Sequence, residues 1–186
     1  MNLSDLSFKV NLQSTDFELF DIPAQFAQDS AVLANKWKDL QREAHPDKFA
    51  AYAAAHGAEG AAAQRIAMQW SVRINEAYNR LKDPLKRATY LCELNGAPIE
   101  AHTNTSMPAA FMMMQIEWRE ALEEAETADE LEQIEHQTLN YKREQLSKIE
   151  QCIDINHDYK TAANEVRALM FVARFVGEIE ARLDKM

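Results

Sequence analysis

Residues 33–49 read LANKWKDLQREAHPDKF, an amphipathic run that ends in the tripeptide His45-Pro46-Asp47. Apolar side chains recur in it at spacings of four, three and four residues, which predicts one buried stripe of a helix: Leu33, Trp37, Leu40 and Ala44. Pro46 disfavours helical geometry in the residue before it. We therefore predict that the helix stops before Pro46, that His45 is extended, and that the tripeptide forms an exposed turn.

Further helices are predicted on both sides of this run. Downstream, the Ala- and Gly-rich residues 50–63 are interpreted as a long loop, and a second apolar stripe follows at Ile66, Trp70, Ile74, Ala77 or Tyr78, and Leu81. Asp83 can cap the next helix and Pro84 can take its first position, so a short helix is expected over about residues 84–94. Upstream, residues 17–23 supply one apolar turn closed by a proline. Residues 17–94 therefore predict a compact four-helix unit.

This unit resembles a J-domain. The resemblance rests on residues 17–20 (FELF) as the first helix, residues 33–44 as the second, and the His-Pro-Asp loop that is invariant in that family. Residues 74–78 (INEAY) through 86–88 (KRA) resemble the ends of the third and fourth helices. The alternative is an ordinary surface turn, because Pro and Asp are both favoured in turns and a lone motif is a weak signal.

Basic residues surround the tripeptide: Lys36, Lys38, Arg42 and Lys48. Such charges usually form a solvated helix face. Only the adjacent tripeptide favours their interpretation as a docking surface. The net charge of −10 over the whole chain of 186 residues disfavours nucleic-acid binding, which requires cations that neutralise phosphates.

Composition and length predict a packed protein of one large or two small domains, since 47% of the residues are apolar. No run approaches the roughly 20 apolar residues that span a bilayer, and no secretory signal is recognised, so we expect a cytoplasmic protein without membrane contact. Cys92 and Cys152 are expected to be reduced thiols in the core. Residues 1–15, in which Leu6, Phe8, Val10 and Leu12 alternate with polar residues, are treated as an extension of unknown role.

A second domain is predicted after Asn95-Gly96-Ala97-Pro98, which ends the fourth helix. The expected division is residues 16–95 for the J-domain, 96–106 for a linker and 107–186 for an antiparallel three-helix bundle. Its first helix starts near Pro108 and ends near Ala125, a capping box from Thr127 to Glu130 opens the second, and Asn156 or Asp158 caps the third. The fold class is therefore all-α.

The outer helices of this bundle carry more apolar residues than one stripe can bury. On the first, Met112, Met113 and Ile116 lie opposite the core stripe, among Glu117, Glu120, Glu123 and Glu124; on the last, Phe171 and Phe175 lie away from the core stripe. Exposed apolar patches commonly mark protein-binding sites, and methionine suits an adaptable one. The alternative is that these residues pack against the J-like domain, and the pattern alone favours neither.

The chain from Phe17 to the C-terminus resembles the HscB family, J-type co-chaperones of iron–sulfur cluster assembly. The segments that carry the resemblance are residues 42–50 (REAHPDKFA), 83–91 (DPLKRATYL) and 111–120 (FMMMQIEWRE). Ordinary DnaJ proteins do not fit, because the chain has no Gly/Phe-rich linker and no Cys-x-x-Cys repeats. The absence of cysteine before Cys92 places the chain with the bacterial type of the family.

The resemblance implies a function for each domain. The tripeptide and the basic face would engage an HscA-type, DnaK-like chaperone and stimulate its ATPase. The second domain would bind the scaffold protein IscU and deliver it to that chaperone. The family's scaffold-binding surface corresponds to Met112, Met113, Ile116, Glu117, Glu120, Glu124 and Phe171, which favours a binding patch. Met112 and Ile116 stand where leucines are expected, a change that conserves volume.

An enzyme is not expected. The five histidines have no metal-ligand spacing, there is no Gly-rich phosphate loop or Gly-x-Ser-x-Gly nucleophile motif, and two distant cysteines cannot hold an iron–sulfur cluster, so no cofactor or metal is predicted. One alternative is a general J-domain co-chaperone that recruits unfolded clients to a DnaK-type chaperone. Another is a structural helical adaptor, which would leave the tripeptide without a role.

Overall fold

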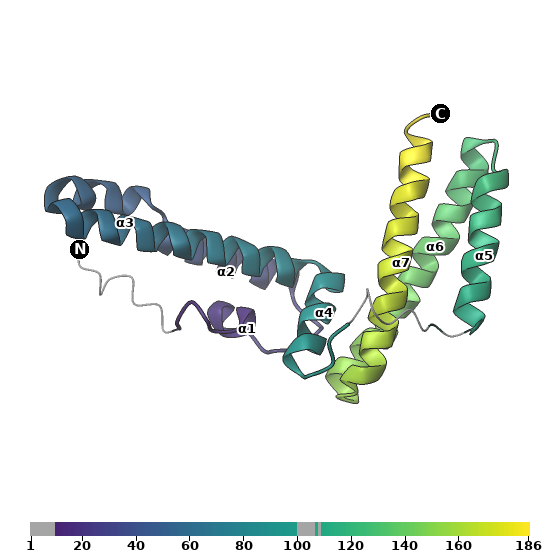
Figure 1. Ribbon diagram of the computed structural model, residues 1–186, viewed down its shortest axis with the longest axis horizontal. Helices are drawn as coiled ribbons and strands as arrows, with labels where there is room; N and C mark the ends of the chain where they lie inside the picture. The colour runs from purple at the N-terminus through teal and green to yellow at the C-terminus, as the bar shows by residue number, and fades with distance from the viewer. Residues whose placement is uncertain (1–9, 100–106, 108) are drawn as a thin grey trace. The chain divides into compact units, whose positions relative to one another are not determined.

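The computed structural model describes residues 10–99, 107 and 109–186, and every regular element within these residues is a helix (Figure 1). The predicted all-α fold class is confirmed. Contacts between Cα atoms divide the chain into two units, Met1–Asp83 and Pro84–Met186. Residues 100–106 of the expected linker (96–106) and the expected helix start at Pro108 lie outside the described residues.

The first unit contains α1 (Asp16–Phe20), α2 (Ser30–Ala44) and α3 (Asp47–Lys82), and α2 lies along α3 (Figure 1). The predicted stripe of α2 is confirmed, because Leu33 and Ala44 are buried and Trp37 and Leu40 are half-buried. The Trp37 indole N–H donates to Asn75 Oδ1 at 2.9 Å, and the Trp37 ring stacks on Tyr78. These contacts fix α2 against the second half of α3.

The long loop predicted over residues 50–63 is wrong. Helix α3 starts at Asp47, directly after Pro46, and includes this whole stretch. Nine of its fourteen residues are alanine, the strongest helix former, so the stretch is helical although it has no clear apolar stripe. The helix is interrupted only at His56 and Gly57; the φ of Gly57 is +52°, which glycine adopts without steric cost.

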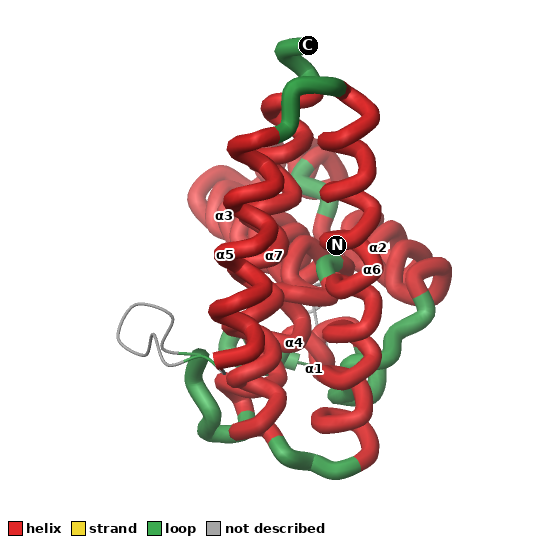
Figure 2. The backbone as a smooth tube through the Cα atoms, turned by 90° about the vertical axis from the view of Figure 1, so that its right-hand side faces the viewer, coloured by secondary structure: helices red, strands yellow, loops and turns green. Residues whose placement is uncertain are grey.

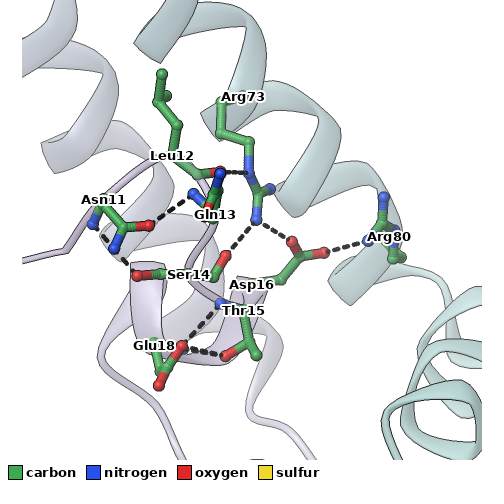
Figure 3. A network of polar contacts seen from close by, with 9 residues as sticks. All are labelled: Asn11, Leu12, Gln13, Ser14, Thr15, Asp16, Glu18, Arg73 and Arg80. Atoms are coloured by element: carbon green, nitrogen blue, oxygen red, sulfur yellow. Dashed lines mark hydrogen bonds and ion pairs between the residues drawn. The ribbon is translucent and has the colours of Figure 1, made fainter.

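The buried carboxylate of Asp16, the first residue of α1, binds two arginines of α3 (Figure 3). Asp16 is fully buried and forms ion pairs with Arg73 at 2.7 Å and with Arg80 at 3.3 Å. Arg73 also donates to the backbone carbonyls of Leu12 and Ser14, at 3.4 and 2.9 Å. The described part of the expected extension, residues 10–15, is therefore held on α3 in turns and bends. Leu6 and Phe8 lie outside the described residues.

Replacing Asp16 by asparagine is expected to lower the free energy of unfolding by about 2 kcal/mol. Breaking a buried ion pair usually costs more, but the Arg80 side chain is 41% exposed and retains partial hydration. Urea unfolding measures the change. Asp21→Asn is the matched control, because the Asp21 side chain is 96% exposed in its ion pair with Lys36 and should give wild-type stability. Equal stability of both variants would contradict a structural role for the Asp16 pairs.

The second unit contains α4 (Pro84–Leu94), α5 (Ala109–Glu124), α6 (Ala128–Glu150), the π-helix η2 (Gln151–Ile155) and α7 (Tyr159–Leu183). Figures 1 and 2 show α5, α6 and α7 side by side, as expected for the three-helix bundle. The start of α4 at Pro84 is confirmed. Helix α4 packs against α7 and is grouped with this unit, whereas the expected J-domain, residues 16–95, includes it. The proposed domain bounds stay a prediction.

The predicted caps of the bundle helices are confirmed. Thr127 accepts from the Glu130 N–H, and the Glu130 carboxylate accepts in return from the N–H groups of Glu126 and Thr127, which lower its pKa. Asp158 caps α7 by accepting from the Thr161 N–H at 3.0 Å. The bundle core is closely packed, and its fully buried side chains include Leu131, Ile149, Leu169, Phe175 and Ile179.

Candidate functional site

The His45-Pro46-Asp47 turn lies at the junction of α2 and α3. Helix α2 ends at the fully buried Ala44, and His45 is extended with φ −63° and ψ 120°, as predicted. The Asp47 N–H donates to His45 Nδ1 at 3.3 Å, which leaves Nε2–H as the donor of the imidazole ring. The side chains of His45 and Asp47 are 54% and 89% exposed. The turn thus presents a ring donor and a carboxylate to a partner.

The basic residues near this turn do not all share one face. Lys38, Arg42 and Lys48 are exposed, and Arg42 pairs with Asp39 at 3.1 Å. Lys36 instead turns to the end of α1, where its Nζ lies 3.2 Å from Asp21 Oδ2. Residues two apart on a helix do not face each other, whereas Lys38 and Arg42 are four apart. The structure therefore brings Lys38 and Arg42 together and separates Lys36 from them.

The second candidate surface lies on α5. Met112, Met113 and Ile116 are 46%, 64% and 56% exposed, so they contribute little to the core of the unit. Three acidic residues of the same helix are also exposed: Glu117, Glu120 and Glu124. The arrangement is an apolar patch with carboxylates beside it, on one helix face. Large apolar side chains that stay exposed in this way commonly mark a protein-binding site.

Phe171 of α7 is half-buried next to α5, with its ring 5.9 Å edge-to-face from Phe111. The expectation that Phe175 joins the exposed side is wrong. Phe175 is fully buried and stacks on Trp118 of α5, with the ring centroids 5.9 Å apart. The α5–α7 interface thus buries a wider strip of α7 than the helical wheel indicates, because two large rings from facing helices stack there.

Arg119 belongs to this surface and is not among the residues predicted for it. Its guanidinium lies over the Phe171 ring, 5.6 Å from the centroid, and its Nη1 is 3.5 Å from Glu178 Oε2. The sequence contains one signal for a special role of this residue, since Arg119 is the only basic residue of α5. The sequence pattern does not show that Phe171 and Glu178 of α7 lie next to Arg119.

The part of the chain that the structure describes offers no group of three or more His, Cys, Asp or Glu residues that could hold a metal ion. Cys92 and Cys152 are free thiols. Burial raises the pKa of Cys92 to about 11, so this thiol is protonated at neutral pH and is a poor metal ligand. Among the described helices, none is long and apolar enough to cross a membrane.

Comparisons with known proteins agree over nearly the whole chain. Residues 107–180 match the family model of the HSCB C-terminal oligomerisation domain. Two proteins named "Co-chaperone protein HscB homolog", from Burkholderia multivorans and Burkholderia thailandensis, are each 43% identical to this chain over 180 residues. In both cases the match covers 95% of this chain and 98% of the relative.

Solved structures show the same similarity. The chaperone HscB from Vibrio cholerae superposes with a TM-score of 0.76 at 32% identity, covering 92% of this chain and 99% of that protein. The human co-chaperone protein HscB superposes with a TM-score of 0.85, covering 95% of this chain and 86% of that protein. Its identity of 24% supports a shared fold alone.

Proposed function

Because this chain belongs to the HscB family of J-domain co-chaperones that serve iron–sulfur cluster assembly, we propose that it stimulates the ATPase of an HscA-type chaperone and delivers the scaffold protein IscU to it. The observation that carries the proposal is the presence of two exposed candidate surfaces, one in each unit. The first is the His45-Pro46-Asp47 turn, and the second is the apolar patch on α5.

The exposed turn supports the chaperone half of the proposal. The Asp47 N–H donates to His45 Nδ1, and this hydrogen bond links the two exposed residues of the turn. Lys38 and Arg42 add positive charge on one face of α2 beside it. Charged groups around an interface accelerate encounter and select a partner of opposite charge. A DnaK-like ATPase with an acidic docking face is the partner that this surface fits. Lys36 is not assigned a direct contact, because it pairs with Asp21.

The patch on α5 supports the scaffold half of the proposal. Its centre contains Met112, Met113 and Ile116, with Phe171 contributed by α7, and its border contains Glu117, Glu120 and Glu124. Interfaces of this kind obtain most of their affinity from large apolar side chains at the centre, whereas the charged border sets specificity and association rate. A folded partner with an apolar patch and a basic border, rather than an unfolded chain, is expected to bind here.

Binding both partners at once provides the mechanism. When the protein holds IscU and docks on the chaperone, the scaffold reaches the chaperone at a high effective concentration, so two modest affinities act together. In this proposal the residues of this chain bind the chaperone and the scaffold and position one beside the other. The chaperone hydrolyses the ATP, and any iron–sulfur cluster is carried by the scaffold. We accordingly place the protein in the cytoplasm, where the chaperone has access to ATP.

The proposal is tested by the ATP hydrolysis rate of the HscA-type chaperone from the same organism. The rate is measured with this protein, with IscU, and with both. We expect each protein to increase the rate several-fold, and both together to increase it beyond the sum of the separate increments. Stimulation that is indifferent to IscU would favour a general J-domain co-chaperone of a DnaK-type chaperone. No stimulation under any condition would contradict the proposal.

A further inference from the structure

Arg119 connects α5 to α7 at the edge of the apolar patch. The guanidinium lies over the aromatic ring of Phe171 and also pairs with Glu178, which is seven residues, or about two helical turns, further along α7. Both side chains of this ion pair are about half-exposed, at 51% for Arg119 and 47% for Glu178. An exposed ion pair by itself contributes little to stability. The contact of Arg119 with the Phe171 ring therefore suggests a role other than stabilising the fold.

The Phe171 ring is held from several sides. Phe111 of α5 meets it edge-to-face at 5.9 Å, Phe175 stacks on it at 6.2 Å, and Arg119 covers it at 5.6 Å. Phe111 and Phe175 are both buried, so they contact the ring from the core side of the unit. Arg119 is the polar, partly exposed contact. Without it, the half-buried ring would have more rotamers available at the surface.

We infer that Arg119, held by Glu178, is a positioning residue that fixes the Phe171 ring in the docking surface before a partner binds. The inference rests on the proposed binding of IscU. A partner that meets a fixed ring does not have to order it, and pre-organisation of this kind increases affinity. Attraction between a cation and an aromatic face is weak at exposed sites, so the contribution to affinity should be about three- to fivefold.

Isothermal titration of IscU into the full-length protein and its variants tests the inference. Arg119→Ala should weaken binding about three- to fivefold, Arg119→Lys should weaken it less, and Glu178→Gln should have an intermediate effect. In a Phe171→Ala background, Arg119→Ala should change the affinity by less than a factor of two, because the ring to be positioned is gone. Arg143→Ala is the matched control: it removes the same charge from an exposed residue of α6 that bonds to Asn140 on its own helix.

An equal loss in both backgrounds would overturn the inference, since Arg119 would then contact the scaffold directly. Tighter binding of Arg119→Ala would also overturn it, because the guanidinium would be shielding the ring. NMR of the free protein separates this inference from the proposed function: Arg119→Ala should increase the side-chain mobility of Phe171. Unchanged mobility would overturn the positioning role whether or not IscU binds, whereas absence of IscU binding by the wild type would overturn the proposed function alone.

Discussion

Replacement of His45 by glutamine is expected to reduce stimulation of the chaperone's ATPase more than tenfold, to near the unstimulated rate. Glutamine offers an amide in place of the imidazole, so it cannot present the ring donor that the Asp47 N–H orients by bonding to Nδ1. The fold should be unaffected, because the His45 side chain is 54% exposed and its backbone is already extended. Single-turnover ATP hydrolysis by the chaperone measures the effect.

The matched control is His136→Gln, the same substitution at an exposed residue of α6, which should retain full stimulation. The thermal unfolding midpoint of the His45→Gln variant and its affinity for IscU should both equal those of the wild type. Retained stimulation by His45→Gln would show that the chaperone does not recognise the turn. Loss of stimulation together with loss of scaffold binding would instead indicate misfolding.

The double variant Met113→Ala/Phe171→Ala is expected to bind IscU at least a hundredfold more weakly than the wild type. Truncation of a large side chain at the centre of an interface costs about 2 kcal/mol or more, and two such changes on one surface cost about 4 kcal/mol. Met113 is 64% exposed, so its truncation removes little from the core of the bundle. Titration calorimetry measures the affinity, and circular dichroism shows whether the bundle is still folded.

Met68→Ala supplies the comparison for this variant, because Met68 is similarly exposed, at 55%, on α3 in the other unit. It should leave the affinity unchanged.

The affinity of the wild type for IscU should fall as the salt concentration rises, since the border of the patch carries three carboxylates. Salt-independent binding to many apolar peptides would support recruitment of unfolded clients, and undiminished IscU binding by the double variant would place the scaffold elsewhere.

Local sequence signals were sufficient for most of the helices. The apolar stripe of α2, the Pro84 start of α4 and the Thr127 capping box depend on residues within a few positions of one another, and all three are found in the structure. The first half of α3 has no hydrophobic periodicity that would indicate a helix, and its alanine content is the only local signal for one. A helix can form from intrinsic propensity where no stripe marks it.

The candidate surfaces were predictable in part. A helical wheel places Met112, Met113 and Ile116 opposite the core, and their exposure agrees with it. A helical wheel does not predict contacts between helices. It therefore does not show the stacking of Phe175 on Trp118, the ion pair of Lys36 with Asp21, or the position of Arg119 over Phe171. Each depends on which residues face one another across two helices, and no local pattern specifies that.

The break at His56 and Gly57 bears on how the length of this chain can change during evolution. One residue inserted into a continuous helix rotates everything beyond it by about 100°, which would move a buried stripe to the surface. At Gly57 the backbone has already left helical geometry, so an insertion or deletion there alters only the segment next to the tripeptide. Residues 63–81, which carry the buried stripe of α3, keep their register against α2. Homologues should therefore differ in length here while sharing one core.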